Sequence, residues 1–89
     1  MPDSSELATD LSGLVARVVA GDEQAARELV ERLWPLVIRI VRGHLPRRGG
    51  EEDLSQEVFM KVFARIDQWR ADQPVEHWVS RVAVNTCLD

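Results

Sequence analysis

DEQAARELVERLWPLVIRIVRGH, residues 22–44, is the longest stretch of this sequence with a continuous helical pattern. Its apolar residues recur every three to four positions, which predicts one amphipathic helix. Asp22 is placed to cap the first turn, and Pro35 predicts a bend because proline removes one backbone hydrogen bond. We therefore expect a long, bent helix that ends near His44. Its predicted buried face holds Ala26, Leu29, Val30, Leu33, Leu36, Val37, Ile40 and Val41.

A shorter helix is predicted before this stretch, over residues 5–20, because apolar residues recur there at the same spacing. Gly21 is placed to end it. We expect the chain to start in a flexible segment that includes the frayed residues 1–4 and extends to about residue 10. The predicted buried face of this helix holds Leu7, Leu11, Leu14, Val15, Val18 and Val19.

Two further helices are predicted after the long one. Residues 45–50, LPRRGG, form the clearest loop in the chain. The three acidic residues that follow suit the first turn of a third helix, which we expect to fade near Asp67. Pro74 suits the first turn of a fourth. The predicted buried faces hold Leu54, Val58, Phe59, Val62, Phe63 and Ile66 in the third helix, and Val75, Trp78, Val79, Val82 and Ala83 in the fourth.

Length and composition indicate a single small folded domain over residues 1–89, with 45% hydrophobic and 29% charged residues. No segment shows a strand pattern, so we expect an all-α fold, a compact bundle of three main helices plus an N-terminal helix. The single cysteine excludes an intrachain disulfide and fits a reducing, cytoplasmic setting. No apolar run reaches the roughly 20 residues that span a bilayer, so no direct membrane contact is expected.

The charge balance limits the function classes. The chain carries a formal net charge of −4. Because free-standing DNA-binding proteins draw much of their affinity from Lys and Arg contacts with phosphates, this chain alone should bind nucleic acid weakly. Catalytic motifs and glycine-rich phosphate loops are missing from the sequence, and His44 and His77 are too few and too far apart for a metal site. We therefore expect no enzyme activity, no cofactor and no metal.

Two residues interrupt the helical pattern. Asn85 falls on the predicted apolar face of the fourth helix, where it is either a hydrogen-bonded core amide or a polar group lining a ligand pocket. Trp69 lies in a short polar connection, where it either folds back onto the core or forms a wall for an unstacked base. Beside it, Arg70 either pairs with an acidic neighbour or reaches a phosphate.

A third feature is a polar face on the third helix. Asp53, Gln56 and Glu57 stand at positions i, i+3 and i+4, so they share one surface. This surface is either an ordinary solvated face or a docking face for a partner rich in Arg and Lys.

These residues together resemble a known family. DLSQEVF at 53–59, followed by VFARIDQWR at 62–70, resembles region 2.2 of the extracytoplasmic-function sigma factors. WVSRVAVNT at 78–86 resembles their region 2.4, and the GD and WPLV stretches at 21–22 and 34–37 resemble region 2.1. The resemblance covers about residues 10–89. It implies a factor that binds bacterial core RNA polymerase and directs it to promoters.

The resemblance also implies roles for the residues singled out. By position, Asp53, Gln56 and Glu57 dock on the clamp helices of the largest polymerase subunit, with Phe59 and Phe63 as the packed side. The connection after that helix and the fourth helix capture the non-template single strand of the minus-ten element and hold a flipped base. The residues implied in DNA binding are Trp69, Val82 and Asn85 at the base, Arg70 and Arg81 near the backbone, and Lys61, Arg65 and Asp72 around them.

The sequence leaves a second interpretation open, a sigma-like helical protein-interaction module that is bound by a regulator and has no DNA function. Its support is the acidic balance and Glu76, which stands where many relatives carry a basic or neutral residue. The resemblance further implies an anti-sigma factor as a partner. The helix-turn-helix domain of the family is absent from these 89 residues, and we expect the chain to be a fragment of a longer protein.

Overall fold

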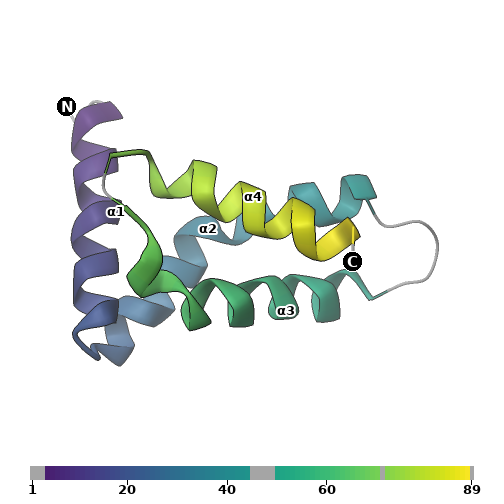
Figure 1. Ribbon diagram of the computed structural model, residues 1–89, viewed down its shortest axis with the longest axis horizontal. Helices are drawn as coiled ribbons and strands as arrows, with labels where there is room; N and C mark the ends of the chain where they lie inside the picture. The colour runs from purple at the N-terminus through teal and green to yellow at the C-terminus, as the bar shows by residue number, and fades with distance from the viewer. Residues whose placement is uncertain (1–3, 45–49, 71, 89) are drawn as a thin grey trace.

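The computed structural model describes residues 4–44, 50–70 and 72–88, with side chains from Leu11 onward. Figure 1 shows one helix standing upright at one end of the molecule, while three others run lengthwise away from it. These described residues contain no strand, and the predicted all-α bundle with an N-terminal helix is confirmed. In chain order the elements are α1 (Ser4–Val19), α2 (Glu23–His44), α3 (Glu51–Ala64), the 3₁₀ helix η1 (Ile66–Gln68) and α4 (Val75–Leu88).

A tight corner joins α1 to α2. Gly21 has φ 98°, a left-handed conformation that glycine adopts without a steric penalty. One carboxylate oxygen of Asp22 accepts hydrogen bonds from the backbone N–H groups of Gln24 (3.0 Å) and Ala25 (3.2 Å), so the predicted N-cap is confirmed. The other oxygen accepts two hydrogen bonds from the Arg17 guanidinium, at 2.9 and 3.0 Å. The bond from Ala25 and those from Arg17 lower the pKa of the Asp22 carboxyl.

The hydrophobic core runs along α2, which contacts each of the other three α-helices. As predicted, α2 continues through Pro35 to His44. Its first turn differs from the prediction, because α1 packs across this end of α2 and buries Ala25 rather than Ala26. The buried residues form a single row at spacing i, i+4: Ala25, Leu29, Leu33, Val37 and Val41.

At α1, the prediction holds for Leu11, Leu14 and Val15, which are buried. Val19 was expected to be buried but is 53% exposed, since the helix ends at this residue and the chain turns away into α2. Leu7, predicted to be in the core, lies outside the side chains that the structure describes, and residues 1–3 of the predicted frayed start and 45–49 of the loop lie outside the described residues. Ser4, the last residue of the predicted frayed start, is the first residue of α1.

α3 ends earlier than predicted. It ends at Ala64, and Arg65 leaves the helix with φ −122° and ψ 13°. The chain then tightens into η1, which still places Ile66 in the core. The periodicity therefore identified Ile66 correctly as a core residue, but it gave the wrong helix boundary, because a 3₁₀ turn keeps nearly the same i+3 spacing of side chains.

α4 confirms the predicted fourth helix but corrects one of its residues. Val75, Val79, Ala83 and Thr86 are buried, and Trp78 and Val82 pack beside them. Asn85 is exposed, so its predicted place on the buried face is wrong. Thr86 occupies that place instead, and each residue of a helix is turned by about 100° from the one before it. The interpretation of Asn85 as a core amide is therefore excluded.

Candidate functional site

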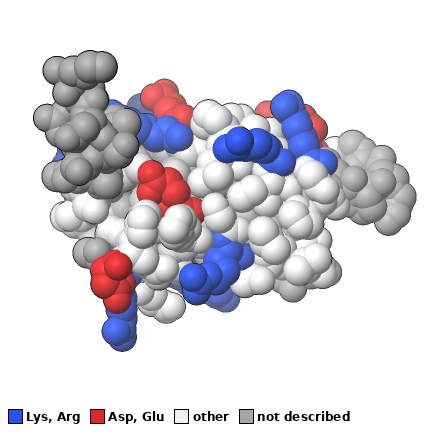
Figure 2. Space-filling model, turned by 90° about the horizontal axis from the view of Figure 1, so that it is seen from above, with Lys and Arg blue, Asp and Glu red and all other residues white. Residues whose placement is uncertain are grey.

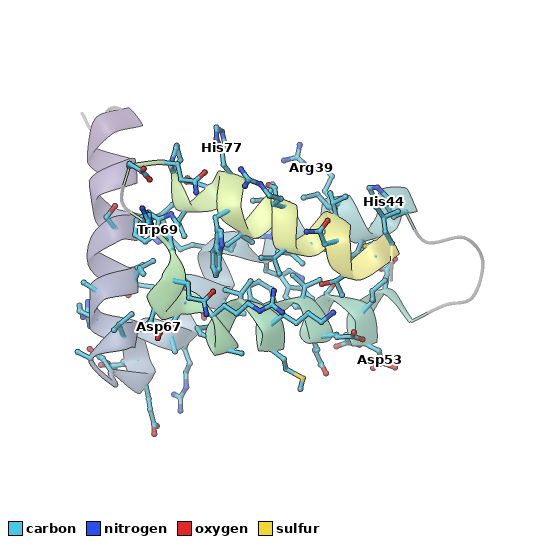
Figure 3. All side chains as sticks on the ribbon, in the orientation of Figure 1. Arg39, His44, Asp53, Asp67, Trp69 and His77 are labelled. Atoms are coloured by element: carbon cyan, nitrogen blue, oxygen red, sulfur yellow. The ribbon has the colours of Figure 1, made fainter. Side chains whose placement is uncertain are left out.

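The polar face of α3 points away from the bundle. Asp53, Gln56 and Glu57 are all exposed. Figure 3 shows Asp53 extending from the outer side of α3, on the side of the molecule opposite α4. Glu57 forms a surface ion pair with Lys61 at 3.7 Å, one turn further along the helix. The structure therefore brings these three residues together on one accessible helix face.

An apolar hollow lies beside this face, between α2 and α3. Phe59 forms its wall: its ring stacks on that of Trp34, with centroids 5.8 Å apart and planes within 8°, and meets Phe63 at 6.5 Å. Phe59 itself is only 6% exposed, so it packs beneath the hollow and contributes little accessible area to it. Met60, in contrast, is 71% exposed at the rim. The hollow is lined by Val30, Trp34, Gln56, Phe59, Met60, Phe63 and Ala64.

Trp69 stands at the end of the domain where α1 lies, directly after η1. Its indole N–H donates a hydrogen bond to the backbone carbonyl of Gln73 at 3.1 Å, and its ring packs partly buried against the core. Figure 3 shows it where α1 meets the chain leading into α4. The prediction that Trp69 folds back onto the core is confirmed. Its half-exposed ring also leaves a surface available for stacking.

The predicted DNA-binding residues of α4 share one side of that helix. Arg81 and Asn85 are exposed and stand one turn apart, and the half-buried Val82 lies beside them. Asn85 lies ten residues beyond Val75, the first residue of α4, which corresponds to about 15 Å of helical rise. The structure therefore places Trp69 and Asn85 near opposite ends of α4.

The remaining predicted DNA-binding residues differ in their surroundings. Arg65, Arg70 and Asp72 are exposed. Within the described part of the chain, Arg70 forms no ion pair with an acidic neighbour, which removes one of its two interpretations. Lys61 is half-buried, and its ammonium group is engaged in the ion pair with Glu57 on the polar face of α3.

Sequence reasoning missed two buried polar residues. Ser55 in α3 is 0% exposed, and its hydroxyl has no hydrogen-bond partner among the residues described. Thr86 in α4 is also buried, but its hydroxyl donates to the Val82 carbonyl at 2.7 Å. The spacing already pointed to Ser55, because it precedes the core residues Val58 and Phe59 by three and four positions.

The described residues contain neither a candidate metal centre nor a helix that could span a membrane. No group of three His, Cys, Asp or Glu side chains there stands close enough to hold a metal ion. None of the helices traced there combines the length and apolar character needed to cross a bilayer. Cys87 is half-buried, and burial raises the pKa of its thiol.

Comparison with known proteins identifies relatives over nearly the whole chain. Residues 29–89 match the family described as sigma-70 region 2. The ECF RNA polymerase sigma-E factor of Escherichia coli (strain K12) is 39% identical over 82 residues, which is 92% of this chain and 42% of that protein. The sigma-E factor of Salmonella typhimurium (strain LT2) shows the same identity and coverage.

A more distant relative comes from another bacterial genus. The ECF RNA polymerase sigma factor ShbA of Streptomyces griseus is 33% identical over 87 residues, which is 91% of this chain and 46% of that protein. The chain thus spans less than half the length of each of these relatives.

Proposed function

The chain belongs to the sigma-70 family and is of the extracytoplasmic-function type, and from this we propose that it docks on core RNA polymerase and opens promoter DNA at the minus-ten element. The chemistry of RNA synthesis is that of the polymerase. This chain supplies recognition and melting, and it acts in the cytoplasm together with the polymerase.

The observation that carries the proposal is the separation of two candidate faces within the matched region. Asp53, Gln56 and Glu57 are exposed on one side of the bundle, whereas Arg81 and Asn85 lie on α4, with Trp69 just ahead of it. A domain with this arrangement can hold polymerase and DNA at the same time. Tethering matters physically, because a chain of net charge −4 gains little from phosphate attraction alone, and a tether raises the local concentration to about millimolar.

The docking half of the proposal is tested by capture of purified bacterial core RNA polymerase. We expect Asp53, Gln56 and Glu57, all changed to Ala, to weaken capture by about tenfold or more, because hot-spot residues dominate such interfaces. The matched control changes Glu23, Gln24 and Glu31 to Ala, which likewise removes two carboxylates and one amide from exposed positions, here on α2. Equal capture by both triple variants contradicts the docking face.

The DNA half is tested with the chain bound to core polymerase and a single-stranded DNA library of randomised sequence. Loss of one base–aromatic stack costs about 1–3 kcal/mol, so Trp69→Ala should weaken retention by roughly 5- to 150-fold, while Trp69→Phe keeps most of it. Asn85→Ala should also weaken retention, with Gln24→Ala as the exposed amide control. Unchanged retention by Trp69→Ala and Asn85→Ala excludes base capture at these residues.

A regulator-bound module without DNA function is the second candidate. The open apolar hollow with Met60 at its rim favours a protein partner, and Glu76 in the first turn of α4 disfavours close contact with phosphates. An anti-sigma factor is a proposed partner under either function. Failure of the folded wild-type chain to capture polymerase would favour this second candidate.

A further inference from the structure

The two halves of α2 differ in charge. Residues 22–32 contain four acidic side chains against two arginines, whereas residues 33–44 contain two arginines and no acidic residue. α4 has the same character, because after Glu76 in its first turn residues 77–88 contain no acidic residue. α2 and α4 pack against each other, and neither residues 33–44 nor residues 77–88 contribute an acidic side chain to the surface that they share, although the chain is acidic overall.

Arg39 is an available cation of this shared surface. Its neighbour Arg42 is engaged, because its guanidinium donates two hydrogen bonds to Glu51 at 3.0 and 3.1 Å. Arg39 is exposed and, among the residues that the structure describes, has no acidic group within ion-pair distance; the same holds for Arg81 of α4. A guanidinium without an intramolecular partner keeps its donors free for an external anion.

The position of Arg39 relates it to α4. Figure 3 shows Arg39 and His77 extending from the same edge of the bundle, away from Asp53 on α3. Figure 2 looks down on this edge and shows basic side chains set apart in mostly uncharged surface, with acidic groups toward the end where α1 stands and beside a basic side chain at the opposite end. The one acidic residue of α4 is Glu76. It lies one turn before Ser80, and its side chain is half-buried.

We propose that Arg39 binds a backbone phosphate of duplex DNA, so that the DNA-binding surface extends from α4 onto the second half of α2. The planar guanidinium suits a phosphate, because two of its N–H groups donate to two oxygens at once. This inference rests on the proposed function, since it takes the DNA to lie along α4. It adds a contact on a helix for which the sequence predicted no DNA role.

The duplex is the expected source of the phosphate, because a contact with a phosphate alone does not require an unpaired base. α2 and α4 both end at the end of the molecule opposite Trp69. The 14 residues of α4 span about 21 Å, which corresponds to about six nucleotide steps of 3.4 Å. A base flipped at Trp69 leaves its own position unpaired. Arg39 is not among the residues proposed to hold an unpaired base, so we expect the strands at its phosphate to be paired.

The test compares Arg39→Ala with Arg27→Ala in the chain bound to core polymerase. Arg27 is the matched control, since it is an exposed arginine of the same helix that lies in its acidic half. The probe is a duplex of random sequence with a single-stranded extension, and the extension strand alone is the second probe. Affinity is measured over a series of salt concentrations, because each phosphate contact on duplex DNA contributes about 0.9 to the slope of log K against log salt.

Arg39→Ala is expected to reduce this slope by about one on the duplex probe and to leave it unchanged on the strand alone. Arg27→Ala should leave both slopes unchanged. An unchanged slope for Arg39→Ala overturns the proposal, and so does an equal change for Arg27→Ala, which would reflect net charge only. An equal loss on the strand alone overturns the assignment to duplex DNA.

The same measurement separates this inference from the proposed function. If Trp69→Ala weakens binding and Arg39→Ala does not change the slope, the phosphate contact alone is wrong. If Arg39→Ala lowers the slope while Trp69→Ala and Asn85→Ala bind as the wild type does, base capture is wrong and the phosphate contact stands.

Discussion

α3 and α4 are both 14-residue helices packed on α2, yet they present opposite surfaces. α3 carries four acidic side chains and one lysine, and an aromatic stack backs its outer face. α4 carries one glutamate and one arginine, and its exposed residues include an amide. The same kind of amphipathic helix thus presents two different outer surfaces, because only the buried row is constrained by packing. The outer residues are free to specialise.

The largest effect is expected from a core mutation in α2, which should disrupt both faces together because α3 and α4 both pack on this helix. Leu33 is 2% exposed in the buried row of α2. Leu33→Ala should lower the free energy of unfolding by about 2–5 kcal/mol, since it deletes packed methyl groups and leaves a cavity. Urea denaturation measures this loss, and exposed Arg27→Ala serves as the control. A loss below about 0.5 kcal/mol would contradict the central place of this row.

A mutation with a smaller expected effect should impair the face on α3 and leave the face on α4 intact. Met60 is 71% exposed at the rim of the apolar hollow, so Met60→Asp should leave stability within about 0.5 kcal/mol. A charge buried against a partner without a pair is costly, and we expect about a tenfold loss or more of polymerase capture. Binding of single-stranded DNA measured on complexes that do form should be unchanged. Wild-type capture by this variant would place the polymerase contact away from the hollow.

A matched pair of buried hydroxyls sharpens the comparison inside the core. Ser55 of α3 has no hydrogen-bond partner among the described residues, whereas Thr86 of α4 donates to Val82. Ser55→Ala should raise stability by about 1 kcal/mol, because it removes a desolvated hydroxyl, and Thr86→Val should lower it by about 0.5–1.5 kcal/mol. Thermal unfolding of both variants gives the two signs. Destabilisation by Ser55→Ala would mean that its hydroxyl has a partner.

The smallest expected effect lies at the corner that supports α1, outside both faces. The pKa of Asp22 is lowered from 3.8 by hydrogen bonds from Ala25 and Arg17. A lowered pKa in the folded state means that this contribution to stability is present above pH 3.8 and is lost as the pH falls through the lower folded pKa.

Asp22→Asn keeps an acceptor for the cap but removes the charge. Its stability deficit against the wild type should therefore be small at neutral pH, because the group is exposed, and should shrink as the pH falls below about 4. Urea midpoints of both proteins across this pH range measure it. A deficit that stays constant would show that the charge of Asp22 plays no part.

Much of the fold was predictable because helical periodicity reports burial directly. The long second helix and the core residues of α3 followed from spacing, and the Asp22 cap followed from the residue type at the helix start. The boundary at Ala64 and the place of Asn85 did not follow from spacing. A periodic pattern does not distinguish a 3₁₀ turn from one more α-helical turn, and a shift of one residue turns a side chain by about 100°.

The candidate site was predictable only in part, for a similar reason. The motif positions of Asp53, Gln56 and Glu57 were read from the sequence, and their spacing placed them on one face. The apolar hollow and the exposed Arg39 were not predicted, because both depend on which helices lie next to each other. Contacts between residues distant in the chain leave no periodic signal within one helix.

The sequence by itself determined the helices, their buried rows and the family to which the chain belongs, because these features depend on local spacing and on residue identity. The tertiary structure alone decided which residues of different helices share a surface. It set Asp53 and Arg39 on different sides of the bundle, packed α1 across the start of α2, and left the Ser55 hydroxyl without a partner among the described residues. The physical reason is that packing couples residues through space, where the relative rotation of neighbouring helices decides what is buried and what remains exposed.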